Sequence, residues 1–372
     1  MNLYDSYEKL SDVLVNFSCE VKSGDKVLIE QWSTDPNFIN CLIRKIRNAG
    51  GHPFVLNYEE LISRELLIGS TESYIKLKTK YMLPVMKDMD AYISIRGSNN
   101  IFENSDVPSE KSKLNNKFYT EPVHFKERIS KKWVILRWPN PAMAQAAGMS
   151  TPSFQDVFFK VCTLDYSKMD KAMNNLVSLM QNTDQINIVS PGTNITFSIK
   201  GQPAIKCSGQ RNIPDGEIFT GPIRYSVNGK ITYNIPTLYN GIRFDNVCLE
   251  VKDGKIFKAT STANTELLNS ILDTDEGSRY FGEFAIGVNP YITKPLLDIL
   301  FDEKMCGSLH LTPGGCYDEA YNGNKSAIHW DMVLCQLSEF GGGEMYFDDA
   351  LIRKDGKFII ESLLPLNPEN LA

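Results

Sequence analysis

Short apolar runs alternate with amphipathic segments along the first half of the chain. Four of these runs have the length of a buried strand. They lie at residues 24–32, 52–58, 90–97 and 131–139. Between the first two, the segment from Asp35 to Gly51 begins on a helix-capping side chain and ends on a glycine pair, so it predicts a helix. This strand–helix–strand order predicts an α/β domain with an open, mostly parallel sheet. A dinucleotide site is not supported, because no GxGxxG follows the first strand.

The pattern changes near residue 185. Two helical segments, residues 152–162 and 166–181, come before the change. After it, alternating polar and apolar positions are interrupted by Pro-Gly, Asn-Gly and Asp-Gly pairs, which favour antiparallel hairpins. We therefore expect an N-terminal α/β domain at residues 1–184 and an α+β C-terminal domain, rich in antiparallel strands, at residues 185–372.

Composition narrows the classes of function. The chain has 372 residues, enough for two domains, and a formal net charge of −6. This charge argues against nucleic-acid binding, which depends on clustered Lys and Arg. The sequence has neither a secretory leader pattern nor an apolar run of about 18 residues, so we expect no membrane segment. Its eight cysteines contain no CxxC pair, which suits reduced thiols and a cytoplasmic protein.

Candidate chemistry gathers in one stretch, GSLHLTPGGCYDEAYNGNKSAIHWDM. It supplies His310, Tyr317, Asp318, Glu319, His329 and Asp331. Imidazole and carboxylate groups are the usual ligands of zinc, cobalt or manganese. In an extended chain, His329 and Asp331 would face one side and Trp330 the other, so one strand can offer two ligands together.

Three glutamates are further candidate ligands. Glu217, Glu283 and Glu303 lie in NIPDGEIFTGP, GSRYFGEFAIGVNP and FDEKMCGSLH. The first two stand among apolar residues near glycines, where an unpaired carboxylate is costly. A salt bridge or a turn contact is the alternative for each. His310 alone would suit a buried core histidine, but together with His329 and Asp331 it favours a metal site.

Other candidates are weaker. His52 and His124 are isolated, and we interpret them as structural or surface residues. Cys306 and Cys316 flank His310, yet neither has the neighbours that activate a thiolate. The set as a whole suits metal-assisted hydrolysis, in which two cations bridged by a carboxylate polarise a carbonyl and lower the pKa of a water. Tyr317 could then donate a hydrogen bond to the oxyanion, or serve as a packed aromatic residue.

The chain resembles the aminopeptidase T and aminopeptidase S metallopeptidases. The resemblance rests on NIPDGEIFTGP, FGEFAIGVNP, FDEKMCGSLHL, the tyrosine after Gly-Gly and GNKSAIHWD, in that order. It extends to RWPNPAMAQAAGMSTPSFQDVFF and GGGEMYFDDALIRKDGKF, and so covers nearly the whole chain. One departure is Pro313, which lies four residues before Tyr317 where the family has a more apolar run.

This resemblance implies a homodimer with a two-metal site in the C-terminal domain and short peptides as substrates. By motif, Glu283 corresponds to the bridging carboxylate and Tyr317 to the catalytic tyrosine. The remaining ligands correspond to Glu217, Glu303, His310, His329 and Asp331. We expect a cytoplasmic aminopeptidase that uses two ions of zinc, cobalt or manganese. The alternatives are a two-metal hydrolase of another amide or phosphoester, and a non-catalytic metal-binding protein.

Overall fold

The computed structural model describes residues 2–372. The chain forms two compact units, one of residues up to Thr163 with Gly209–Pro214, the other of Leu164–Ser208 with Asp215–Ala372. The boundary expected after residue 184 lies beyond helix α8 (Tyr166–Gln181), which belongs to the second unit. Contacts explain this placement, because Asn175 of α8 donates to the Ser362 carbonyl (2.8 Å) and Lys206 pairs with Asp170 (2.9 Å).

The first unit contains the parallel sheet that the sequence predicts. Its strand order is β2-β1-β3-β4-β8, and every neighbouring pair is parallel. The strands are β1 (Lys26–Trp32), β2 (His52–Tyr58), β3 (Ala91–Arg96), β4 (Lys132–Arg137) and β8 (Asn212–Ile213). The last is added by the segment that returns from the second unit's part of the sequence. The α/β prediction is confirmed.

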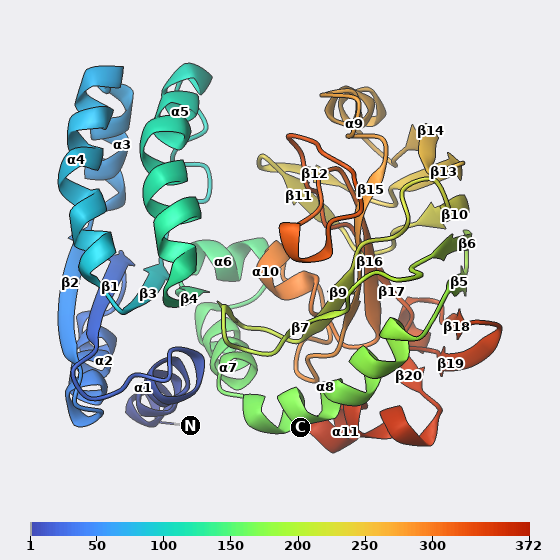
Figure 1. Ribbon diagram of the computed structural model, residues 1–372, viewed down its shortest axis with the longest axis horizontal. Helices are drawn as coiled ribbons and strands as arrows, with labels where there is room; N and C mark the ends of the chain where they lie inside the picture. Colours follow the sequence, from blue (N-terminus) through green and yellow to red (C-terminus); the bar gives the residue numbers. More distant parts are fainter. Residues whose placement is uncertain (1) are drawn as a thin grey trace. The chain divides into compact units, whose positions relative to one another are not determined.

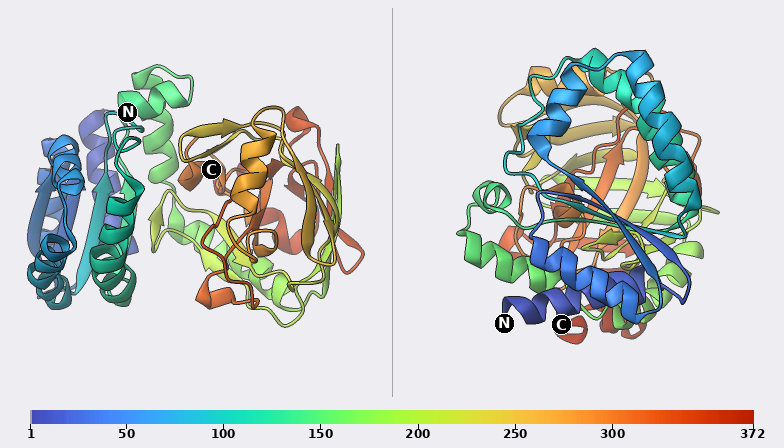
Figure 2. Two further views of the ribbon diagram at one scale, coloured as in Figure 1. Left: turned by 90° about the horizontal axis from the view of Figure 1, so that it is seen from above. Right: turned by 90° about the vertical axis from the view of Figure 1, so that its left-hand side faces the viewer.

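Helices cover both faces of this sheet, with α1 and α2 on one side and α4 and α5 on the other (Figures 1 and 2). On the second face, Leu28 and Tyr92 pack with Ile75 and Met86 of α4. Asp35 caps α2 by accepting from the Asn37 amide at 2.8 Å, as its position predicts. The helical segments are α1 (Leu3–Asp12), η1 (Val13–Ser18), α2 (Pro36–Asn48), α3 (Glu60–Ile68), α4 (Glu72–Asp88), α5 (Ser109–Asn115), η2 (Asn116–Glu127), η3 (Arg128–Ser130), α6 (Pro141–Ala146) and α7 (Thr151–Cys162).

The second unit is built on antiparallel sheets, as expected. An eight-stranded sheet has the order β14-β13-β10-β6-β5-β18-β19-β20, and a five-stranded sheet has the order β17-β16-β15-β9-β7. The strands of the first are β5 (Gln185–Ser190), β6 (Thr193–Ser198), β10 (Asn228–Thr232), β13 (Cys248–Lys252), β14 (Lys255–Thr260), β18 (Glu344–Phe347), β19 (Ala350–Lys354) and β20 (Lys357–Phe358). Those of the second are β7 (Ile205–Cys207), β9 (Glu217–Thr220), β15 (Phe281–Gly287), β16 (Ser308–Pro313) and β17 (Val333–Cys335).

The two sheets share a core. Phe197 of β6 meets Phe284 of β15 with ring centroids 4.9 Å apart. Arg353 of β19 donates to the Ser308 carbonyl of β16 at 2.8 Å. Smaller elements complete the unit: β11 (Thr237–Tyr239), β12 (Ile242–Phe244), α9 (Thr265–Leu272), α10 (Ile299–Asp302), η4 (Asp318–Ala320), η5 (Ser338–Phe340), η6 (Glu361–Leu366) and α11 (Pro368–Leu371).

Hairpin turns fall at the predicted dipeptides. Asn240-Gly241 joins β11 to β12, and Asp253-Gly254 joins β13 to β14. All four residues have positive φ, between 48° and 80°, which is the conformation of the tight hairpin turn that these pairs favour. Among residues 2–372, no helix is both long and apolar enough to cross a membrane.

Candidate metal centre

Three neighbouring strands of the five-stranded sheet carry the core of the candidate site. In their register, Thr312 of β16 lies opposite Glu283 of β15, His310 lies opposite Ala285, and Glu217 of β9 lies opposite Gly287. Directly paired residues, and residues two apart, share one face of a sheet. The register therefore places Glu217, Glu283, His310 and Thr312 on the same face, where all four are buried.

Glu283 lies between the two histidines. Its Oε1 is 2.9 Å from His310 Nε2, and its Oε2 is 3.8 Å from His329 Nε2. His310 Nε2 also lies 3.7 Å from Glu217 Oε2. Ligand atoms of Glu283, His310 and Asp331 all lie within 4.8 Å of one another. One carboxylate thus faces both imidazoles through its two oxygens.

His329 and Asp331 face the same side, although they do not lie in a regular strand. The segment forms one isolated bridge, between His329 and Gly314, and β17 starts only at Val333. Even so, His329 Nε2 lies 3.0 Å from Asp331 Oδ1. Trp330 points away, packing on Tyr239 with ring centroids 4.6 Å apart. The two candidate ligands therefore face one side and Trp330 the other, although the segment is not a regular strand.

Hydrogen bonds orient both of these ligand candidates. His329 Nδ1 lies 2.7 Å from the Gly315 carbonyl, which can only accept, so Nδ1 donates and Nε2 is left to face the cluster. Thr312 Oγ1 donates to Asp331 Oδ1 at 2.7 Å. Such contacts fix the direction of a metal ligand before the ion arrives.

Glu303 follows α10 and forms an ion pair with its neighbour Lys304. Lys304 is fully buried, and its Nζ also lies 3.4 Å from Glu217 Oε1. Sequence reasoning missed this lysine. The available signal was its position beside Glu303, a candidate ligand, because a carboxylate that is buried needs a cationic partner.

The carboxylates of the cluster outnumber its one lysine, Lys304. Burial raises the pKa of Glu303 to about 8, against the opposing effect of Lys304, and it also raises the pKa of Glu283. Burial alone would lower the pKa of His310, but Glu283 and Glu217 raise it to about 9. In the same way, Asp331 outweighs burial and raises the pKa of His329 to about 10. In the absence of metal, protonated histidines therefore supply the positive charge that the carboxylates require.

Two buried carboxylate oxygens indicate that divalent cations fit this cluster. Glu217 Oε2 and Glu283 Oε2 are both buried without a hydrogen-bond donor. Buried carboxylate oxygens are costly unless they are hydrogen-bonded or bound to a cation. Carboxylate and imidazole donors are those that zinc, cobalt and manganese accept.

Tyr317 lies beside the carboxylates. Its ring is 4.8 Å from that of His329 and 5.7 Å from that of Phe219. About half of the residue is exposed, at 51%, so the phenol stands between the cluster and solvent. Burial of its hydroxyl end and the charges of Asp331 and Glu283 raise the pKa of Tyr317 well above its ordinary value. The phenol therefore keeps its proton and can act as a donor.

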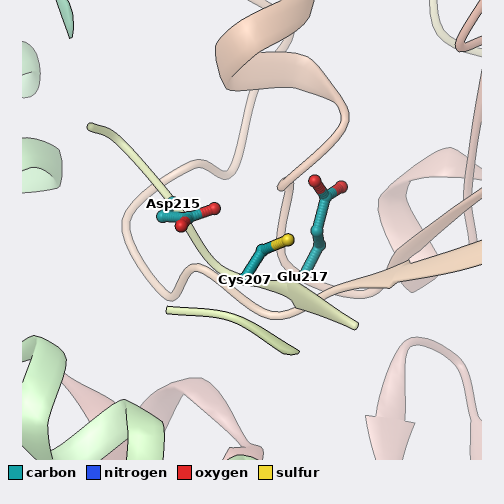
Figure 3. Close-up of side chains that lie close together, drawn as sticks. All are labelled: Cys207, Asp215 and Glu217. Atoms are coloured by element: carbon teal, nitrogen blue, oxygen red, sulfur yellow. The ribbon is translucent and has the colours of Figure 1, made fainter. Parts of the chain in front are cut away.

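A second group of possible ligands adjoins Glu217. Figure 3 shows Cys207 of β7 and Asp215, from the turn before β9, beside Glu217. Ligand atoms of these three residues lie within 4.8 Å of one another. Sequence reasoning missed Cys207 and Asp215. Asp215 had a signal, because it stands two residues before Glu217 and extended residues at that spacing share a side.

The remaining sequence candidates lie in other surroundings. Asp318 and Glu319 are exposed in η4. His52 is exposed at the start of β2. His124 contacts the ring of Tyr119 at 5.5 Å, within the first unit. Cys316 donates to the Asn324 carbonyl at 3.1 Å, a structural contact.

Comparison with known proteins gives one family and one fold. Residues 4–358 match the family described as thermophilic metalloprotease (M29). Aminopeptidase T of Thermus thermophilus is 23% identical over 379 residues, which cover 88% of this chain and 91% of that protein. The solved structure of wild-type AmpT from Thermus thermophilus has a TM-score of 0.76 at 19% identity, covering 96% of this chain and 99% of that one.

A different solved enzyme has the same fold. The structure of 2,5-dihydroxypyridine dioxygenase from Pseudomonas putida KT2440 matches with a TM-score of 0.62 at 12% identity, covering 97% of this chain and 99% of that one. At such identity the match concerns the fold alone. The chemistry of this chain therefore has to be argued from its own site.

Proposed function

The chain belongs to the M29 family of metalloproteases and is a metal-dependent aminopeptidase, and we propose that it works through two divalent metal ions held by the acidic cluster of the second unit. The observation that carries this proposal is Glu283, whose two oxygens face different histidines. A carboxylate in that position suits a bridge between two ions. Such a pair of ions supplies Lewis-acid polarisation of the peptide carbonyl and a water of lowered pKa.

We assign the ligands by their place in the cluster. Glu283 would be the bridging ligand, with His310 facing its Oε1 and His329 facing its Oε2. The remaining ligands would be Glu217, Glu303 and Asp331. Lys304 neutralises part of the charge on Glu217 and Glu303, and so permits both glutamates to remain buried.

The chain's own side chains would select and orient the peptide. The free α-amine of the substrate, which is largely a cation near neutral pH, would be bound by a carboxylate of the cluster or by one of the ions. Tyr317, held at the edge of the cluster against His329, would donate a hydrogen bond to the carbonyl oxygen as that atom gains negative charge. Recognition of the amine confines cleavage to the N-terminal residue of short peptides.

We further propose that zinc, cobalt or manganese serves as the metal, since the donor set suits all three. We propose a cytoplasmic location, which is supported by eight unbridged thiols. A homodimer is proposed from the family resemblance.

The test is hydrolysis of aminoacyl-amide substrates by the purified protein before chelation, after chelation and after metal is restored. We expect activity to be lost on chelation, to return with metal, and to be absent when the substrate's α-amine is acetylated. Equal cleavage of acetylated substrates would contradict an aminopeptidase. Turnover of phosphoesters in place of the amides would favour the alternative two-metal hydrolase.

A further inference from the structure

The first unit contains a cluster of buried charge that the proposed aminopeptidase site does not use. Glu30 of β1 is the single buried carboxylate among the described residues of this unit. It already accepts a hydrogen bond from the Tyr92 hydroxyl. Four cationic side chains belong to the same cluster. Lys78, Arg96 and Arg128 act on Glu30, and Arg211 acts on Arg128. Positive charge is therefore in excess.

Arg128 is the centre of this cluster. It is 95% buried, with 5% of its surface exposed, and it begins the short helix η3. Its guanidinium lies 4.1 Å from the ring centroid of Trp133 and 5.8 Å from that of Tyr92. Contacts of this kind use the flat faces of the guanidinium, whereas its hydrogen-bond donors point outward in the plane.

Two of those in-plane donors have no acceptor. Arg128 Nε and Nη1 are buried and make no hydrogen bond. A buried guanidinium whose donors have no acceptor is strongly disfavoured, because burial removes its hydration. Neighbouring positive charge adds to this cost. Burial and Arg96 together lower the pKa of Arg128 to about 10. Burial and Arg128 likewise lower the pKa of His124 to about 3, so that imidazole stays neutral.

Arg128 stacks on Tyr92 and Trp133, which pair near the amino ends of β3 and β4. Arg96 lies at the carboxyl end of β3, and its Nε is 3.4 Å from the Ser94 hydroxyl. Arg96 is exposed, and Trp133 is half-buried, so the cluster is connected to solvent. The planar fork of a guanidinium matches the oxygens of a phosphoryl or carboxylate group.

We propose that the first unit carries an oxyanion-binding site at Arg128, and that its ligand is a phosphoryl group. Its double negative charge offsets the excess of cations around Glu30 better than a single carboxylate does. The acceptors that Arg128 Nε and Nη1 lack are supplied by two phosphoryl oxygens. Arg96 provides a second charge at the exposed side.

The experiment is calorimetric titration of the full-length, metal-loaded protein with inorganic phosphate, at constant ionic strength in chloride buffer. Arg128→Met keeps an apolar body against Trp133 and removes the donors. We expect the dissociation constant for phosphate to rise about tenfold or more, as loss of a charged hydrogen-bonding partner predicts. Arg96→Gln changes an exposed side chain, so it tests the site without risk to the fold, and a smaller rise is expected.

Two controls separate this site from others. Arg243→Gln, an exposed arginine of the second unit paired with Asp245 at 2.8 Å, should leave the dissociation constant unchanged. Glu283→Gln should also retain phosphate binding, because it alters only the acidic cluster. Loss of phosphate binding in Glu283→Gln but not in Arg128→Met would overturn the proposal, since phosphate would then be bound at the metal centre.

The identity of the ligand follows from two further probes. Tighter binding of methyl phosphate than of inorganic phosphate would support an organic phosphate as the ligand, and weaker binding would support free phosphate, provided that both depend on Arg128. Acetate bound as tightly as phosphate would overturn the phosphoryl assignment. So would the absence of phosphate binding by the correctly folded wild-type protein.

Discussion

Each of the two units contains a cluster of charged side chains, in which carboxylates predominate in one unit and cations in the other. In the second unit, four carboxylates from different elements surround two histidines and Lys304. In the first unit, Lys78, Arg96, Arg128 and Arg211 form a cluster with one buried carboxylate, Glu30. Each cluster also contains buried polar atoms without a partner: carboxylate oxygens in one, guanidinium nitrogens in the other. A cluster rich in carboxylates favours a cationic ligand, and a cluster rich in cations favours an anionic one.

The clusters differ in how their side chains are oriented. In the acidic cluster, Thr312 holds Asp331 and the Gly315 carbonyl holds His329. In the basic cluster, aromatic rings hold Arg128 by its faces and leave its donors free. Hydrogen bonds to ligand side chains fix direction closely, as coordination of a metal requires. Stacking leaves the guanidinium of Arg128 more freedom of orientation, which suits an oxyanion whose charge is shared among several oxygens.

The largest effect is expected when the centre of the acidic cluster loses its charge. Glu283→Gln keeps the shape of the side chain but removes the carboxylate that faces both histidines. We expect kcat/KM on an aminoacyl amide to fall by more than the roughly 10²–10³-fold that one lost transition-state donor costs. Bound metal, measured by elemental analysis, should fall with it. Glu250→Gln, which removes a partly exposed partner of Lys258, is the matched control, and normal turnover by Glu283→Gln would refute the assignment.

Tyr317→Phe separates chemistry from metal binding. We propose that the phenol of Tyr317 donates a hydrogen bond to the oxyanion, so removal of its hydroxyl should lower kcat by about 10²–10³-fold. KM and metal content should change little, because the ring can still pack against His329. An unchanged kcat would show that Tyr317 is a packing residue, the alternative that its sequence context left open.

Thr312→Val tests whether hydrogen bonding prepares the acidic cluster. Valine keeps the shape of the side chain but cannot donate to Asp331. We expect metal affinity, measured by competition with a chelator, to fall by roughly 10–100-fold. Thr312→Ser should restore it, since serine keeps the donor. If valine and serine behave alike, orientation of Asp331 by Thr312 is unimportant.

The smallest effect on turnover, but a large one on stability, is expected for Lys304→Met. Removing one partner from a buried ion pair typically costs about 3–5 kcal/mol of unfolding free energy. We expect that loss in the chelated protein and a smaller one after metal is added, because the cations then compensate Glu217 and Glu303. Denaturant unfolding of both forms measures it, with the exposed Lys258→Met as control. Equal losses of unfolding free energy with and without metal would show that Lys304 acts independently of the metal site.

Local patterns in the sequence predict much of this structure. The four apolar runs of the first unit become β1 to β4, and the Asn-Gly and Asp-Gly pairs become hairpin turns. The shared side of His329 and Asp331 follows from the twofold period of an extended chain. These features depend on neighbours a few residues apart, and the sequence displays them directly.

Features that depend on distant contacts could not be predicted in this way. The helical pattern of α8 does not reveal which unit it packs against. Its hydrogen bonds with Ser362 and Lys206 place it in the second unit. Nothing in the local sequence distinguishes Lys304 from a surface lysine. Its burial depends on its contact with Glu217 of β9, which is distant in sequence. Arg128 and Trp133 are close in sequence, but the excess of charge around them arises only when β1, β3, β4, α4 and the segment that carries Arg211 assemble.

The most direct test of the central claim is a metal titration of the chelated protein, followed by aminoacyl-amide hydrolysis and by elemental analysis of the bound ions. A site in which Glu283 bridges two ions predicts that activity saturates at two equivalents of metal per chain, and that Glu283→Gln binds neither ion tightly. Full activity at one equivalent, or activity that survives complete chelation, would contradict it.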